Sequence, residues 1–194
     1  MKKHLLKIIP LYKDEDKLIK RASGNDREAQ YGLYTKYAPK MLSVCRYYVK
    51  DEQFAEDVMI RGFFKVFKHL DTFRREGSFE GWIRQIMVRE CISFLRSKKS
   101  LYFIEEESPG KIAGYAVEGG PEALETEEIQ FLIDNLPDGY KTVFLMFAVE
   151  GYSHKEIAEA LRISENTSKS QLFKARKMLQ EKIKESERRE NGTR

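Results

Sequence analysis

The sequence predicts an all-α protein with two small helical domains, a flexible acidic linker between them and a helix-turn-helix in the second domain. Three observations lead to this fold class. Apolar residues recur at helical spacing in several segments. No segment of convincing length alternates apolar and polar residues as a strand does. Residues 101–120 combine glycine, proline and glutamate, which is typical of a linker.

The first domain is expected over residues 14–100. A helix over 14–22 leads into a turn at residues 23–25, where Asn25 can cap the next helix. Pro39 marks a break or the first turn of a further helix that runs to about Val49. Asp51 is predicted to cap a helix with the apolar stripe Met59, Phe63, Val66 and Leu70.

The last helix of this domain is predicted over 79–96. Its apolar stripe, which we expect to face the core, consists of Ile83, Met87, Cys91 and Phe94. The opposite face collects Trp82, Gln85, Arg89, Ser93 and Arg96.

The second domain is expected over residues 121–185, with helices over 122–135 and 138–149 and then a pair joined by a tight turn. Ser153 and Glu156 have the spacing of a capping box, so the first helix of the pair begins near Ser153. Ser164 is a second predicted N-cap, and the helix after it buries Ser168, Leu172, Ala175 and Leu179. We expect the polar tail from Ser186 to be disordered.

Charge is distributed unevenly along the chain, although the formal net charge is only +4. Between Lys17 and Lys99 there are 18 Lys and Arg against 10 Asp and Glu. Between Arg162 and Lys184 there are 7 against 2, whereas residues 101–120 have 1 against 4. Two basic zones separated by an acidic segment indicate two contacts with nucleic acid.

Nothing in the sequence indicates catalysis. The two cysteines, Cys45 and Cys91, lie in helical patterns without metal-ligand spacing, and the three histidines are far apart. No phosphate-binding glycine loop occurs. We therefore expect neither an enzyme nor a metal or other cofactor. The short, interrupted apolar patch at the start of the chain is no signal peptide, and no run is long enough to span a membrane, so a cytoplasmic protein is expected.

The second helix of the helix-turn-helix has a polar face suited to the major groove of DNA. Short polar groups in its first turns can reach base edges, and its lysines can reach phosphates. The alternative is a solvated face on an ordinary helical hairpin. The candidate duplex-binding residues are Asn166, Thr167, Lys169, Ser170, Phe173 and Lys174.

The polar face of residues 79–96 combines one tryptophan with arginines. A lone tryptophan is more often part of a core, but beside cationic side chains it offers a stacking surface for single-stranded nucleic acid. The loop over 73–79 adds two arginines and a glycine, and such a loop can hold a base extruded from the stack. The candidate single-strand contacts are Arg74, Arg75, Ser78, Phe79, Trp82, Gln85, Arg89, Ser93 and Arg96.

The segments LDTFRREGSFEGWIRQI, CISFLRSKK and LPDGYKTVFLMFAVEGYSHKEIAEALRISENTSKSQLFKAR resemble the two domains of an extracytoplasmic-function sigma factor of the sigma-70 family. The resemblance covers roughly residues 18–184. The second motif also resembles two-component LuxR-type regulators, so the pair of motifs in one chain carries the specificity.

The resemblance implies transcription initiation with core RNA polymerase as a partner. The second domain would read the minus-35 promoter element as duplex through the residues given above, where Gln171 replaces a frequent Arg. The first domain would hold the non-template strand of the minus-10 element and assist melting. Asp57, Ile60 and Arg61 align with the segment that binds the polymerase clamp, where the family commonly has Gln and an acidic residue at 60 and 61.

Two rival functions remain open at this stage. One is a helix-turn-helix regulator that binds duplex DNA without polymerase-dependent promoter opening, which predicts an α/β receiver or a ligand pocket in the first half. The other is an interaction module whose basic faces bind an acidic protein. By resemblance, an anti-sigma factor is a further expected partner, placed between two loosely tethered domains and covering the 59–70 helix or the recognition face.

Overall fold

The computed structural model describes residues 15–97 and 126–191, and within these ranges the chain is helical and contains no β-strand. The predicted all-α class is confirmed. The first half consists of α1 (Glu15–Ser23), α2 (Arg27–Tyr48), α3 (Glu52–Lys68), a 3-10 turn η1 (Leu70–Thr72) and α4 (Phe79–Ser97). The second half consists of α5 (Thr126–Asp134), α6 (Asp138–Phe144), a π-helical turn η2 (Leu145–Val149), α7 (His154–Leu161) and α8 (Glu165–Asn191).

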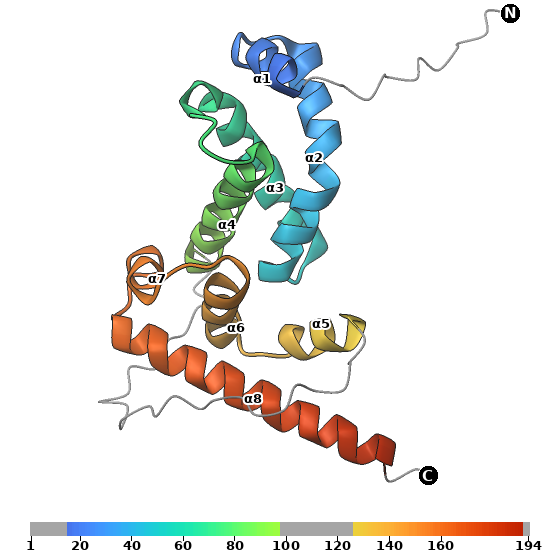
Figure 1. The fold of residues 1–194 in the computed structure, drawn as a ribbon, viewed down its shortest axis with the longest axis vertical. Coiled ribbons are helices and arrows are strands. Elements are labelled where there is room, and N and C mark those ends of the chain that lie inside the picture. Colours follow the sequence, from blue (N-terminus) through green and yellow to red (C-terminus); the bar gives the residue numbers. More distant parts are fainter. Residues whose placement is uncertain (1–14, 98–125, 192–194) are drawn as a thin grey trace, which may run out of the picture.

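The helices form two neighbouring bundles. Figure 1 shows α1 to α4 together, with α5, α6 and α7 lying between that bundle and the long α8. Helix α2 contacts α1, α3 and α4, and α8 contacts α5, α6 and α7. The predicted linker lies outside the described residues.

Helix α2 continues through Pro39, so the predicted break there is wrong. One stripe of buried side chains runs along α2, with two members before Pro39 and two after it: Leu33, Tyr37, Met41 and Cys45. Because this stripe packs against three other helices, tertiary packing compensates for the hydrogen bond that proline cannot donate.

The predicted cap at Asn25 is also displaced by one residue. Asn25 has a left-handed backbone with φ of 62°, which asparagine tolerates better than most residues. Asp26 is extended instead, and its carboxylate accepts a hydrogen bond from the Ala29 amide at 3.1 Å. The cap at Asp51 is confirmed by a 3.0 Å bond from the Phe54 amide.

Helices α3 and α4 pack as predicted. Met59, Phe63, Val66 and Leu70 are buried, as are Ile83, Met87 and Cys91, whereas Phe94 is only half-buried. Gly62 allows the close approach, because a Cβ at this position would collide with the Met87 sulfur.

The predicted helix-turn-helix is present. Ser153 and Glu156 form both bonds of the capping box, and Ser164 Oγ accepts from the Thr167 amide at 2.9 Å. Arg162, in the left-handed conformation, ends α7. Ser168, Leu172 and Ala175 are buried and Leu179 is half-buried, as the spacing predicted.

Two helix ends in the second half of the chain differ from the predictions. The predicted helix over 138–149 changes after Phe144 into the wider π turn. Helix α8 extends to Asn191, so the prediction of disorder from Ser186 is wrong, because the Glu and Arg of this tail have good helix propensity.

The two halves are in contact within the described residues. Arg84 of α4 pairs with Glu150, which follows η2, and α4 contacts α7. Their buried apolar side chains form one continuous cluster, from Leu18 to Leu172. Over 15–97 and 126–191, the chain has no helix with both the length and the apolar character to cross a membrane.

Candidate nucleic-acid interface

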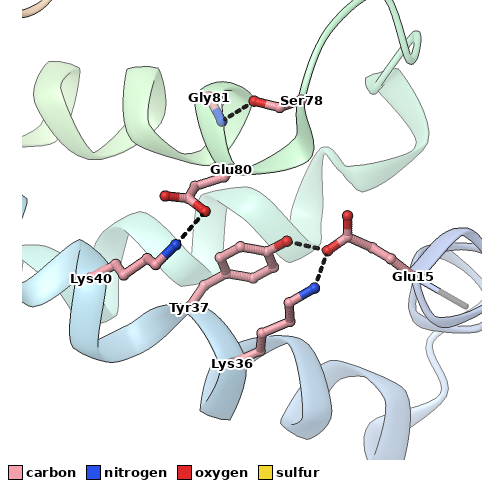
Figure 2. Close-up of polar contacts among 7 residues, drawn as sticks. All are labelled: Glu15, Lys36, Tyr37, Lys40, Ser78, Glu80 and Gly81. Carbon is pink, nitrogen blue, oxygen red and sulfur yellow. Dashed lines mark hydrogen bonds and ion pairs between the residues drawn. The ribbon is translucent and has the colours of Figure 1, made fainter. Parts of the chain in front are cut away.

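The loop between η1 and α4 closes a pocket against α1 and α2. Its lining comes from Glu15, Asp16, Ile19, Lys36, Tyr37, Phe73, Arg75, Gly77, Ser78, Phe79 and Glu80. Arg75 in this loop has φ of 61°, a conformation uncommon outside glycine and asparagine. Ser78 Oγ accepts from the Gly81 amide at 3.0 Å and so fixes the start of α4 (Figure 2).

Polar contacts from α1 and α2 hold the other wall of this pocket. Figure 2 shows the Glu15 carboxylate accepting hydrogen bonds from Lys36 Nζ, at 2.5 Å, and from the Tyr37 hydroxyl. Across the pocket, Lys40 Nζ donates to Glu80 at 2.8 Å. The wall is therefore an array of paired charges around one aromatic ring.

The ionisation of these groups follows from their partners. Burial raises the pKa of Glu15, but the bonds from Lys36 and Tyr37 outweigh it, so this pKa lies below its ordinary value. Burial and the bond to Glu15 both raise the pKa of Tyr37. Glu15 is thus held ionised and Tyr37 neutral at physiological pH. Sequence reasoning missed Glu15, Lys36, Tyr37 and Lys40, because no motif near residues 73–96 points to α1 or α2.

The first residue of the loop, Phe73, packs in an aromatic cluster with two rings of α4. The Phe79 and Trp82 rings are nearly parallel, with centroids 5.7 Å apart, and Phe73 lies 5.1 Å from Phe79 and 5.4 Å from Trp82. Phe79 is buried, which corrects its place among the single-strand contacts. Its ring packs against Tyr37 and Phe73, so it supports the loop instead of facing a ligand.

The other predicted single-strand contacts lie at or near the surface. Arg74, Arg75, Ser78, Gln85, Arg89 and Ser93 are exposed, and Trp82 and Arg96 are half-buried. Trp82 and Arg89 also line a second, shallow depression with Lys65, His69, Thr72, Ile86 and Glu90. The structure therefore brings the tryptophan, the arginines and the loop to one side of the first bundle.

The recognition face of α8 is largely open. Asn166, Lys169 and Phe173 are exposed, and Ser170 and Lys174 are half-buried. Thr167 differs from the prediction, because only 6% of it is exposed and its hydroxyl is 2.8 Å from Ser164 Oγ. Gln171, which stands where the family often has Arg, is only 1% exposed, so its side chain is not available to a phosphate in this structure.

A histidine braces the recognition helix from α7. His154 Nδ1 is 2.9 Å from the buried Ser168 Oγ, and the imidazole stacks on Phe147 with centroids 4.7 Å apart. Burial lowers the pKa of His154, and the nearby charges of Lys169 and Arg176 lower it further. A neutral imidazole therefore joins the two helices of the motif.

The predicted polymerase-binding residues Asp57, Ile60 and Arg61 are all exposed on α3. Ile60 is 55% exposed, and the neighbouring Phe64 is 71% exposed. Sequence reasoning missed Phe64, although an aromatic residue four positions after Ile60 lies on the same helix face. Together these two side chains form an exposed apolar patch beside one acidic and one basic residue.

Known proteins are similar to this chain in both halves. The family model Sigma-70 region 2 matches residues 33–101, and the model Sigma-70, region 4 matches residues 126–179. The ECF RNA polymerase sigma-E factor of Haemophilus influenzae is 27% identical over 177 residues, covering 86% of this chain and 93% of the relative. The ECF RNA polymerase sigma factor SigW of Bacillus subtilis is 26% identical over 180 residues, covering 87% and 96%.

Two solved structures also align with the chain. One is the sigma factor RpoE in complex with the anti-sigma factor NepR from Bartonella quintana, with a TM-score of 0.48 and 19% identity over 78% of this chain and 94% of that one. The other is CnrH in complex with the cytosolic domain of CnrY, with a TM-score of 0.47 and 18% identity over 88% and 97%.

Proposed function

Since the chain belongs to the sigma-70 family, in its extracytoplasmic-function group, we propose that its two helical bundles divide promoter recognition between unpaired and paired DNA. The observation that carries this proposal is the presence, in one chain, of an aromatic and cationic surface on the first bundle and a capped recognition helix on the second. Duplex readout needs a rigid helix in a groove, whereas melting needs unstacked bases held by aromatic and cationic groups.

The first bundle, proposed to extend over residues 14–100, is the site for the non-template strand of the minus-10 element. The 73–78 loop is proposed to hold a flipped base against the Glu15–Tyr37 wall. Trp82, which lines the second depression, is proposed as a stacking surface for the strand outside that pocket. The arginines of the loop and of α4, with two polar residues of α4, are proposed to contact the phosphates: Arg74, Arg75, Gln85, Arg89, Ser93 and Arg96.

The second bundle, proposed over residues 121–185 after a linker at 101–120, is the site for the minus-35 duplex. Asn166, Lys169, Ser170, Phe173 and Lys174 are the proposed contacts. Because Thr167 is buried, its proposed role is to hold the N-terminus of α8 in place, with Ser164. Such a helix presents base-reading groups at its first turns and cations further along.

Core RNA polymerase is proposed to dock on the exposed face of α3. Ile60 and Phe64 supply apolar surface there, with Asp57 and Arg61 beside them. An anti-sigma factor is proposed as a further partner of this chain, as the family membership implies. We propose a cytoplasmic protein that acts by binding and has no catalytic centre.

The rival regulator is disfavoured by the first half of the chain. It predicts an α/β receiver or a ligand pocket there, and residues 15–97 are a helical bundle without a strand, which disfavours the receiver. The rival interaction module shares the basic surfaces but does not predict promoter opening.

Run-off transcription with purified core RNA polymerase on genomic promoter fragments tests the proposal. Addition of the full chain is expected to give transcripts that core polymerase alone does not produce. A chain that binds duplex DNA yet yields no transcript on any template would support the regulator instead.

A further inference from the structure

Three carboxylates line the pocket that the loop between η1 and α4 closes, and their charge limits what the pocket can hold. They belong to Glu15, Asp16 and Glu80. Lys40 engages Glu80 at 2.8 Å, whereas the Asp16 side chain is 71% exposed and lies 3.9 Å from Arg75 Nε. This acidic set disfavours a phosphate, because like charges repel. The pocket therefore suits the base of an extruded nucleotide, which is read at the edge of its ring.

Glu15 offers one carboxylate oxygen to this pocket. Within the described residues, Lys36 Nζ, at 2.5 Å, and the Tyr37 hydroxyl both donate to the same oxygen, Oε1. Figure 2 shows the second oxygen, Oε2, turned away from both donors. A carboxylate oxygen has two lone pairs, so Oε1 is already occupied while Oε2 can accept an N–H from a ligand.

The charge of Glu15 makes Oε2 a strong acceptor. Although burial raises the pKa of Glu15, the bonds from Lys36 and Tyr37 lower it, so the carboxylate is ionised. Hydrogen bonds to an ionised group are roughly twice as strong as those between neutral groups. Lys36 Nζ lies beside this carboxylate and has further N–H groups to donate. The wall of the pocket thus presents an acceptor next to a donor.

The Watson–Crick edges of the four bases meet this acceptor and donor differently. Cytosine and adenine have an exocyclic amine beside an unprotonated ring nitrogen, so they supply a donor and an acceptor in adjacent positions. Thymine has a carbonyl in place of the amine, and this carbonyl would face the carboxylate. Guanine pairs with a carboxylate through two N–H groups on two oxygens, and Oε1 of Glu15 is already occupied.

We propose that Glu15 and Lys36 determine which base the pocket accepts: one with an exocyclic amine beside an unprotonated ring nitrogen, which is cytosine or adenine. Glu15 Oε2 accepts from the amine, and Lys36 Nζ donates to the ring nitrogen. Tyr37 is a positioning residue, because its hydroxyl is bonded to Oε1 and holds the carboxylate in place. This selection rests on the proposed function, which assigns an extruded base to this pocket.

Labelled oligothymidylates of 12 nucleotides test the selection on the full chain by fluorescence anisotropy. One strand is all thymine, and the others have a single cytosine, adenine, guanine or 2-pyrimidinone, which is cytosine without its amine. Because every other base is thymine, the single different base sets the register. We expect the cytosine and adenine strands to bind roughly tenfold more tightly than the thymine strand, and the other two to stay within about threefold of it. Comparison of cytosine with adenine shows which ring fits better.

Glu15→Gln removes the charge and keeps the length of the side chain. Because an amide can also donate to the thymine carbonyl, this variant should bind all the strands with affinities within about threefold of one another. Glu52→Gln is the matched control, since Glu52 is an exposed carboxylate at the start of α3 that pairs with Arg46 at 3.3 Å and does not line the pocket. The control removes the same charge and should keep the wild-type ratios between strands.

A purely structural role of Glu15 predicts a different result. Glu15→Gln would then weaken binding of every strand equally and leave the ratios unchanged, which would overturn the proposal. Equal affinities of the wild type for the cytosine and 2-pyrimidinone strands would also overturn it, and this comparison needs no variant.

Base selection and the proposed function can fail separately. If the wild type gives run-off transcripts but binds all the strands equally, base selection fails and the proposed function stands. If it selects cytosine or adenine but gives no transcript on any template, the role in transcription initiation fails and the selection stands. Failure of every strand to bind would overturn the selection and the proposed single-strand site together.

Discussion

The two proposed DNA surfaces are built in different ways. On the first bundle, a loop with a left-handed Arg75 lies over a cluster of rings, and its wall is held by charges from α1 and α2. On the second, one straight helix is fixed by caps and by buried polar side chains, and its outer face is open. The first is assembled from parts distant in sequence, whereas the second is almost entirely local.

Unpaired and paired DNA place different demands on the protein surface that binds them. An unpaired base has faces and edges that must be enclosed, so a pocket has to be formed by several elements. A duplex presents its edges in a groove, so a rigid helix suffices if its inner side is well anchored. Substitutions on one surface should therefore leave binding at the other nearly unchanged.

The largest effect is expected from Trp82→Ala. Loss of one base-stacking surface should weaken binding of a single-stranded oligonucleotide by about 1–3 kcal/mol, with duplex binding retained. Fluorescence anisotropy with both forms of the same promoter sequence measures this. Trp82→Phe is the control, because it keeps a ring beside Phe79. An equal loss of affinity for single-stranded and duplex DNA would contradict the independence of the two surfaces and would indicate unfolding.

A smaller effect, on stability, is expected from Ser153→Ala. The substitution removes the side-chain half of the capping box and should lower the free energy of unfolding by about 1 kcal/mol. Urea denaturation measures it. Ser97→Ala is a suitable control, because Ser97 is exposed at the end of α4 and its hydroxyl donates to the Phe94 carbonyl of the same helix. A loss as small as that of the control would mean that packing alone holds α7.

Lys169→Ala should weaken duplex binding only through the loss of a contact with a DNA phosphate. Lys169 is exposed, and its contact with Glu165 is a weak surface pair at 3.9 Å. Removal of one phosphate contact should reduce the salt dependence of duplex affinity by about one unit of slope, uniformly across sequences. Lys184→Ala, about four turns further along α8, is the control. A change in base preference instead would assign Lys169 to base edges.

The smallest effect concerns pH. The pKa of His154 in the folded protein lies below its ordinary value of 6.5, so the unfolded chain takes up its proton first as pH falls. Stability from this group is therefore complete above the ordinary value and declines as pH falls below it. In the variant His154→Gln, the melting temperature should depend less on pH between about pH 7.5 and 5.5 than it does in the wild type. An identical slope in both proteins would contradict a neutral imidazole between Phe147 and Ser168.

Local chemistry in the sequence was sufficient for much of the second bundle. A capping box needs only a serine and a glutamate three residues later, and a buried stripe needs only apolar residues one turn apart. Both features are local in sequence, and the structure confirms the caps and the buried stripe. The same reasoning failed where a side chain had two plausible environments. Phe79 and Thr167 were assigned to DNA, but both are buried. The Tyr37 ring of α2 packs on Phe79, and the Thr167 hydroxyl is 2.8 Å from that of Ser164.

The helical class, the capped pair and the apolar stripes could be predicted from the amino acids alone, because these features depend on residues within a few positions of one another. Only the tertiary structure decided that α2 would pass through Pro39, that Glu15 and Tyr37 would close a pocket under the 73–78 loop, and that Glu150 would meet Arg84. These outcomes depend on contacts between residues 21 to 66 positions apart, and no local pattern encodes which distant partner a charge or a ring will find.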